Sequence, residues 1–252
     1  MVSEGIGVVV STARLTKLVA AAVTEASLAA GYVASEPLDG MDVAEPGSRK
    51  PSWVRVWCAK ADSGCPHMTA AVMATVQKDG YGGVGINARA WIVSAAVADV
   101  LRDMPGAALA GGGAEPNFLE SVLFGFFEHP QDPREISVAG EAAIADGVGE
   151  FTRLLAGPVE DWFAARGSVS ALLELALLPN LTGLDRVNPD PVRLRGIVIL
   201  CALNGRSRDA AALVDEYLRR DGFHKWDSIE QASAFDAAMR ERFPKYRQVR
   251  TR

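Results

Sequence analysis

Three side chains in the first third of the chain are of types that bind metal ions. Cys58, Cys65 and His67 follow a C-x6-C-x-H pattern, so two sulfurs and a nitrogen could meet near one turn. A structural zinc site needs four such ligands, and a catalytic site needs three and a water molecule. The spacing is not that of a standard zinc knuckle. These residues are the metal candidates of the sequence, but we predict no metal site and no cofactor.

A glycine-rich segment resembles a phosphate-binding loop. Residues 80–85 read G-Y-G-G-V-G, which matches the G-x-G-x-x-G pattern of dinucleotide-binding folds. In that fold the strand leads directly into the glycines, and an acidic residue follows about twenty positions later. Here Lys78 and Asp79 intervene, and Asp103 falls at the end of an expected helix. The segment is more typical of a hairpin turn, so we do not predict nucleotide binding.

Nucleophilic and acid–base chemistry have little support in the sequence. The segment around Cys65 lacks the G-x-S-x-G elbow, although a pair with His129 or His224 formed across the fold stays open. The acidic residues expected on helices follow no spacing that marks catalytic carboxylates. Their positions are more typical of solvated helix faces. These residues are Glu135, Glu141, Glu150, Glu160 and Asp161. The sequence leaves enzymatic activity open and favours a protein without it.

Trp53, Arg55 and Trp57 are the candidates for partner binding. They alternate in an expected strand and therefore project from one of its faces. Trp and Arg are enriched in interface hot spots. We predict that they bind a partner if helices cover the opposite face. The alternative is that Trp57 lies in the core.

The composition is that of a globular protein. The chain has 252 residues, of which 49% are hydrophobic and 23% charged, enough for one large domain or two small ones. Three widely spaced cysteines, the third being Cys201, favour free thiols in a reducing compartment. The apolar run Ile6 to Val10 is too short for a signal core or a membrane span. We expect a cytoplasmic bacterial protein with no membrane partner.

The charge is unevenly distributed. The net charge is -5, yet the last stretch carries about +5, with one acidic residue among six basic ones: Arg240, Arg242, Lys245, Arg247, Arg250 and Arg252. The acidic remainder favours a partner protein with a basic surface, because complementary charge raises the association rate. The acidic remainder also disfavours nucleic acid as a partner, except through phosphate contacts of the basic tail. We expect this tail to be a short solvated terminus.

The hydrophobic pattern changes along the chain from strands to helices. It predicts a helix from Ser11 or Thr12 to about Ala30, strands at 53–60, 69–77 and 83–87, and a helix at 91–101. Further helices are expected near 117–127, 137–155, 158–166, 168–177, 191–204, 208–220 and 228–242.

Helix-start signals support several of these assignments. Pro158 and Pro191 suit first turns, and Asp227 with Glu230 forms a capping box.

These elements predict an α+β fold, with an N-terminal antiparallel meander flanked by helices and a mainly α-helical second half. Residues 1–110 would form the meander domain. Residues 114–252 would form a helical domain, or a helical extension of the same core, after a linker at Gly111-Gly-Gly113.

Residues 12–101 resemble a known group of domains. A helix that closes at Gly31-Tyr32, a meander that includes Trp53-Val-Arg-Val and Gly83-Val-Gly-Ile-Asn87, and a further helix follow in order. This order is similar to small uncharacterised bacterial α+β domains of the toxin-immunity and polymorphic-toxin neighbourhood, although the acidic segment 35–51 departs from it. The resemblance implies an immunity-like binding role and carries over no functional residue.

We therefore expect a protein that binds another protein, as an immunity-like or accessory factor, without catalytic activity. The alternative is a small-molecule-binding protein or enzyme with a pocket between the sheet and the helical half. A closed pocket where polar side chains converge would favour the alternative, and a flat aromatic and acidic patch would favour the binder.

Overall fold

The structure is a computed structural model that describes residues 11–36, 53–60, 64–112, 118–179 and 187–251. It confirms the predicted α+β class. In the described residues a six-stranded sheet has the order β1-β2-β3-β4-β5, and β6 also pairs with β4. All the pairings are antiparallel. The strands are β1 (Tyr32–Ala34), β2 (Trp53–Lys60), β3 (Thr69–Lys78), β4 (Val84–Val93), β5 (Phe118–Leu123) and β6 (Ile136–Val138).

The edge of the sheet beyond β4 differs from the prediction. The strand expected at 83–87 continues to Val93, so helix α2 (Ala95–Arg102) begins later than position 91, with Ser94 as its N-cap. The helix predicted near 117–127 is instead β5, followed by the short helix α3 (Gly125–Glu128). The ladder with β4 satisfies the backbone groups of this segment, and this tertiary pairing outweighs its local helical spacing.

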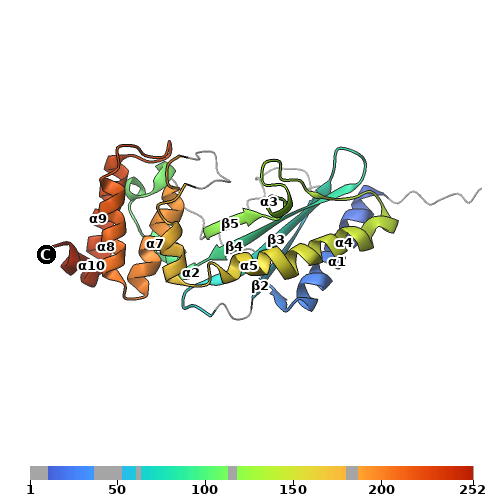
Figure 1. Cartoon of the computed structure of the whole chain (residues 1–252), viewed down its shortest axis with the longest axis horizontal. Helices are drawn as coiled ribbons and strands as arrows, with labels where there is room; N and C mark the ends of the chain where they lie inside the picture. Colours follow the sequence, from blue (N-terminus) through green and yellow to red (C-terminus); the bar gives the residue numbers. More distant parts are fainter. Residues whose placement is uncertain (1–10, 37–52, 61–63, 113–117, 180–186, 252) are drawn as a thin grey trace, which may run out of the picture.

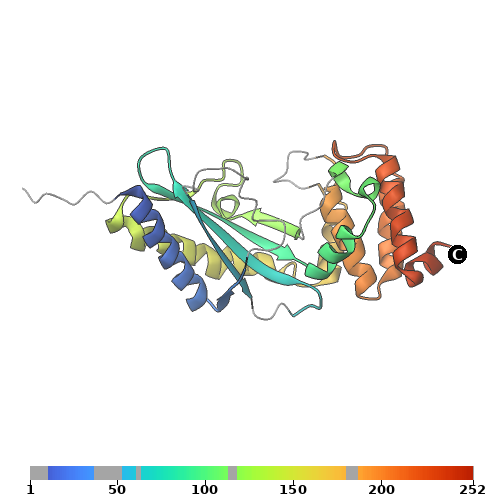
Figure 2. The same cartoon turned by 180° about the vertical axis from the view of Figure 1, so that it is seen from behind.

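Helices cover one face of the sheet. These are α1 (Thr12–Ala29), α4 (Ile144–Leu154) and α5 (Glu160–Ala164), and Figures 1 and 2 show α4 and α5 on the same side of the strands. Val19 of α1 and Phe151 of α4 are fully buried in the same apolar core as Val76 of β3. The start predicted for α1 is confirmed, because the Ser11 hydroxyl accepts a hydrogen bond from the Arg14 N–H.

Two helices that the sequence separates are continuous. Helix α4 passes into α5 through a π-helical turn, η4 (Leu155–Val159), which contains Pro158. Proline has no N–H to donate, so a wider turn accommodates it inside a helix. The expectation that Pro158 begins a new helix is therefore wrong, as is the start at 137, where β6 and the 3-10 turn η3 (Glu141–Ala143) precede α4.

The remaining helices form the second half of the chain. They are α6 (Val169–Leu175), α7 (Pro191–Leu203), α8 (Ser207–Leu218), α9 (Ile229–Arg242) and α10 (Pro244–Arg250). Helices α7 to α10 gather at the end of the molecule opposite α1 (Figure 1). Helix α7 contacts β5 and α2, and one apolar core includes residues from both halves. The strands β5 and β6 lie beyond the predicted boundary at 110–114 and complete the sheet.

The basic C-terminal stretch is not a solvated terminus. Tyr246 of α10 is fully buried, and its hydroxyl donates to Asp236 Oδ1 of α9 at 2.6 Å. Arg250 donates to Asp236 Oδ2 at 2.9 Å and also pairs with Asp215. Arg242 pairs with Asp103 at 3.0 Å. Carboxylates far away in sequence thus hold this stretch in place, which its local composition does not reveal.

The first prediction concerns the core of α7. Leu200 has no exposed surface, so Leu200→Ala should lower the free energy of unfolding by about 2–5 kcal/mol through lost burial and the cavity left behind. Urea denaturation measures this loss. The control is Leu178→Ala, because Leu178 is 52% exposed and its truncation should cost much less. Equal stability of Leu200→Ala and the wild type would show that α7 is not a core helix.

Candidate functional site

The three residues predicted to bind a partner lie on the face of β2 away from the main core. Val56 and Cys58, which alternate with them, are buried in the helix-covered core. The Arg55 guanidinium carbon lies 4.3 Å from the centre of the Trp53 ring. Trp53 and Arg55 are half-buried, whereas Trp57 is only 6% exposed. Low exposure is more typical of a packing residue, so the partner-binding role of the three stays a prediction.

A second aromatic and basic pair lies on the same face of strand β4, which β3 separates from β2. Trp91 is buried in a small apolar cluster, and Arg89 stacks over its ring at 5.1 Å from the centroid. Arg89 Nη1 donates to Ser121 Oγ at 3.2 Å, and burial lowers the pKa of Arg89. With Arg55, this gives the face two guanidinium groups.

The metal candidates do not form a recognisable site. Cys58 is buried in the sheet core, and burial raises the pKa of its thiol. Cys65 and His67 lie in the turn before β3, where His67 has a positive φ of 64°. In the described ranges, no group of three or more His, Cys, Asp or Glu side chains is arranged to hold a metal ion.

The glycine-rich segment 80–85 begins in the hairpin turn between β3 and β4, and its last two residues belong to β4. The Asp79 N–H donates to the Gly83 carbonyl, and Asp79 Oδ1 accepts from the N–H groups of Tyr81 and Gly83 at 2.8 Å. Gly82 has a φ of +96°, which favours glycine. An aspartate occupies the centre of the turn, where a phosphate-binding loop would offer its N–H groups to the ligand.

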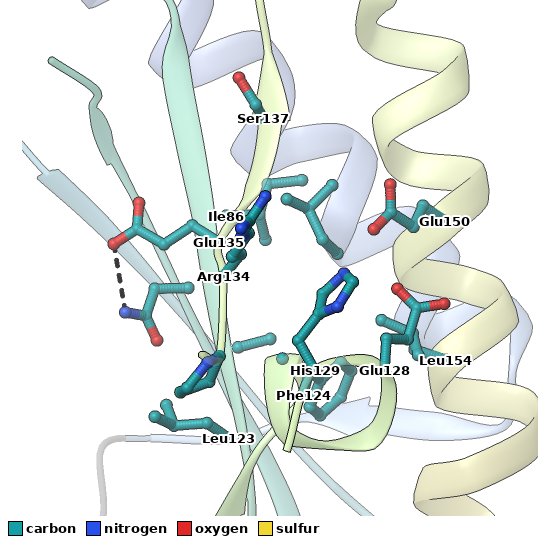
Figure 3. Close-up of a pocket in the computed structure, with 15 residues that line it drawn as sticks. Ile86, Leu123, Phe124, Glu128, His129, Arg134, Glu135, Ser137, Glu150 and Leu154 are labelled. Carbon is teal, nitrogen blue, oxygen red and sulfur yellow. Dashed lines mark hydrogen bonds between the residues drawn. The ribbon is translucent and has the colours of Figure 1, made fainter. Parts of the chain in front are cut away.

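A pocket lies where the edge of β4 is divided between two partner strands (Figure 3). Strand β5 pairs with residues 89–93 of β4, and β6 pairs with residues 84–86. Between these two ladders the segment 124–135, which includes α3, borders a cavity of about 230 Å³. We call it the edge pocket. One side of it is formed by α4, so it lies between the sheet and a helix of the second half.

The edge pocket has apolar walls and a charged rim. Ile86, Phe124 and Leu154 contribute apolar surface. The exposed rim residues are Glu128, His129, Arg134, Glu135 and Glu150. Figure 3 shows Glu135 on one side and Glu128, His129 and Glu150 on the other. None of Cys58, Cys65 and Cys201 lines the pocket, so the open possibility of a Cys–His pair with His129 finds no support there.

Hydrogen bonds fix the position of the Glu135 carboxylate. Its Oε1 accepts from Gln77 Nε2 at 3.2 Å and from Asn87 Nδ2 at 3.3 Å. A Cβ added to Gly85 would lie 2.1 Å from Glu135 Oε2, so the carboxylate occupies the space that a side chain would need. On the other side of the rim, Glu128 forms an ion pair with Arg153 of α4.

The floor of the pocket contains an unusual backbone group. The Ala88 carbonyl accepts from the Phe124 N–H at 2.9 Å, so the backbone groups of Ala88 face the divided edge. In a continued ladder the Ala88 N–H would donate to the Phe124 carbonyl. That carbonyl instead accepts from the Phe127 N–H at 3.0 Å, because Phe124 has the helical conformation that begins α3. Among the hydrogen bonds of the described residues, none has the Ala88 N–H as donor.

Sequence reasoning missed this pocket. It placed Glu135 and Glu150 on solvated helix faces and considered His129 only as a partner for cysteine. One signal was available, because Gly85 in the middle of a strand indicates that another group approaches the backbone closely. The approaching group is the Glu135 carboxylate, which comes from the segment just before β6 and which no local pattern identifies.

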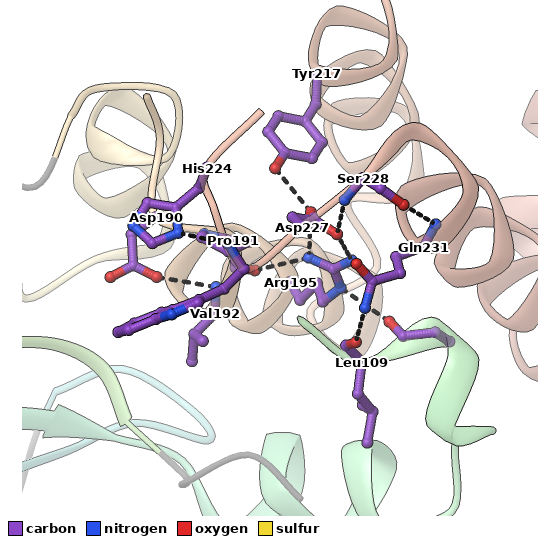
Figure 4. A network of polar contacts seen from close by, with 12 residues as sticks. Leu109, Asp190, Pro191, Val192, Arg195, Tyr217, His224, Asp227, Ser228 and Gln231 are labelled. Atoms are coloured by element: carbon purple, nitrogen blue, oxygen red, sulfur yellow. Dashed lines mark hydrogen bonds and ion pairs between the residues drawn. The ribbon is translucent and has the colours of Figure 1, made fainter. Parts of the chain in front are cut away.

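A second polar cluster lies in the helical half and has a structural role (Figure 4). Arg195 is 1% exposed and pairs with both oxygens of Asp227 at 2.8 Å. Its Nε donates to the Ala108 carbonyl at 2.9 Å, and the Tyr217 hydroxyl donates to Asp227 at 2.8 Å. This cluster attaches the segment after α2 to the helical half. The prediction that Asp227 caps α9 is wrong, because Ser228 is the N-cap and Asp227 binds Arg195.

Comparisons of this chain with protein-family models, with curated proteins and with solved structures gave no match. The resemblance to toxin-immunity domains therefore stays a prediction. Among the described residues, no helix combines the length and the apolar character that crossing a bilayer requires.

The second prediction separates packing from partner binding in β2. Trp57→Ala should lower the free energy of unfolding by about 3–5 kcal/mol, because Trp57 is almost fully buried. Trp53→Ala is the matched control and should cost less, since Trp53 is half-buried on the same face. Thermal melting of both variants tests this. If Trp57→Ala has the same melting temperature as the wild type, this result would instead support the predicted hot spot.

Proposed function

We propose that this protein works by binding a partner protein with a basic surface, as an immunity-like or accessory factor, and that the edge pocket is the contact site. The observation that supports the proposal is a concave apolar pocket whose exposed rim carries three carboxylates, Glu128, Glu135 and Glu150. Apolar concave surface with a polar rim is the anatomy of a protein interface, and like-signed charges on the rim select a partner of opposite charge.

The rim remains acidic after its internal ion pairs are considered. Glu128 is paired with Arg153, and Arg134 with Asp132 at 3.0 Å. Glu135 and Glu150 have no cationic partner among the ion pairs of the described residues. Their negative charge is therefore available to lysine or arginine side chains of a partner, which could reach them without first breaking an internal pair.

The tryptophan and arginine face of the sheet is a second candidate surface. It carries Arg55 and Arg89, and the Glu135 carboxylate, which accepts hydrogen bonds from Gln77 and Asn87, lies on the same face. Binding through Trp53, Arg55 and Trp57 stays a separate hypothesis.

A small-molecule-binding protein or enzyme is the second candidate function. The observation that favours it is His129, an imidazole on the rim of a pocket of about 230 Å³ with Glu128 and Glu150 on the same side (Figure 3). Imidazole and carboxylate groups are the usual proton donors and acceptors of enzymes. Dependence of binding on the acidic rim and on the salt concentration would favour a basic partner protein.

The third prediction tests the acidic rim with acetylated hexalysine as the probe. The double variant Glu135→Gln and Glu150→Gln should bind the probe about tenfold more weakly than the wild type, because two exposed charges are lost. Isothermal titration calorimetry at low salt measures the affinity.

The matched control removes two exposed carboxylates that do not line the pocket, through Asp161→Asn and Glu174→Gln. This control variant should bind hexalysine nearly as well as the wild type. Equal weakening in both double variants would mean that the probe senses only net charge, and the edge pocket would then lose its proposed role.

A further inference from the structure

We infer that the edge pocket takes a neutral hydrogen-bond acceptor from the partner, such as the side-chain amide of glutamine, held beside basic residues that contact the rim. This inference rests on the proposed function and specifies the chemical group that enters the pocket. It starts from the Ala88 N–H on the pocket floor.

The Ala88 N–H is a buried donor that faces the pocket. Ala88 is 3% exposed and lines the cavity, and its carbonyl is already bonded to the Phe124 N–H. A ligand that covers this N–H without supplying an acceptor leaves a buried donor unpaired, which costs free energy, whereas a ligand oxygen satisfies it. The floor therefore selects an oxygen acceptor rather than a purely apolar group.

The size and the walls of the pocket limit what can carry this acceptor. A volume of about 230 Å³ corresponds to roughly eight water molecules in the liquid. A single side chain fits this space, whereas a folded segment does not. The apolar surfaces of Ile86, Phe124 and Leu154 suit the methylene groups of such a side chain.

The charges of the rim determine which acceptor is favoured. A carboxylate entering the pocket would be repelled by Glu135 and Glu150, which have no cationic partner among the ion pairs of the described residues. A cation that reached the floor would meet the positive end of the Ala88 N–H and leave its charge in apolar surroundings. A neutral amide avoids both costs, and flanking lysines keep their charges at the exposed rim.

Two tripeptides test this inference on the intact protein. Ac-Lys-Gln-Lys-NH2 supplies the side-chain amide, and Ac-Lys-Met-Lys-NH2 has the same charge and a central side chain of similar length without it. We expect the glutamine peptide to bind about tenfold more tightly, which is the effect of one added hydrogen bond. In an NMR titration, the Ala88 amide proton should shift downfield with the glutamine peptide only.

A variant of the floor residue provides the complementary test. Ala88→Pro removes the N–H, and in this strand that N–H supports no ladder bond of the described residues. This variant should bind both tripeptides with the lower affinity of the methionine peptide. Ala88→Gly retains the N–H and should keep the tenfold preference. If Ala88→Pro fails to fold, the NMR titration of the wild-type protein is the test. A downfield shift of the Ala88 amide proton with the glutamine peptide only would support the inference, and its absence would contradict it.

The outcomes distinguish this inference from the proposed function. Equal binding of the two tripeptides, with dependence on Glu135 and Glu150, would overturn the neutral acceptor and leave the acidic contact site standing. Absence of binding by both peptides and by hexalysine would overturn both proposals.

Discussion

The direction of the backbone at Phe124 determines the shape of the sheet edge. Its N–H still belongs to the ladder with β4, but its carbonyl already belongs to helix α3. The ladder therefore stops at Ala88, and the chain returns to the same edge only at β6. The cavity, its apolar walls and its acidic rim all follow from this division, because the segment 124–135 has to cross between two ladders on one strand.

The elements that the sequence predicts well have strong local signals. The serine-capped amphipathic helix α1, the alternating strand β2 and the proline-initiated helix α7 lie close to their predicted bounds. Strand β5 was mistaken for a helix, because its apolar residues also fit helical spacing and the stabilising partner is the distant edge of β4. Gly85 belongs to the segment predicted as a hairpin turn and to the strand predicted at 83–87, but neither prediction reveals that the Glu135 carboxylate fills the space beside it.

Buried charges show the same limitation. Asp227 has the local pattern of a helix cap, but its carboxylate pairs with Arg195, 32 positions earlier in the chain. The basic tail has the local pattern of a solvated terminus, but Asp236 receives hydrogen bonds from Tyr246 and Arg250. A buried charge leaves no periodic trace in the sequence, and its partner is known only once the helices are placed. The acidic rim of the edge pocket is exposed, but its residues come from separate segments of the chain, so no local pattern groups them.

The most direct test of this account is the hydrogen-exchange rate of the Ala88 amide in the unliganded protein, measured residue by residue by NMR. The neighbouring residues Ile86 and Ala90 pair with Ile136 and Val122, so their amides provide internal references on the same strand. The account predicts that Ala88 exchanges at least about tenfold faster than both, because its N–H has no ladder acceptor. Protection of Ala88 equal to that of Ile86 and Ala90 would show that the ladder is continuous and that the edge pocket has no free donor.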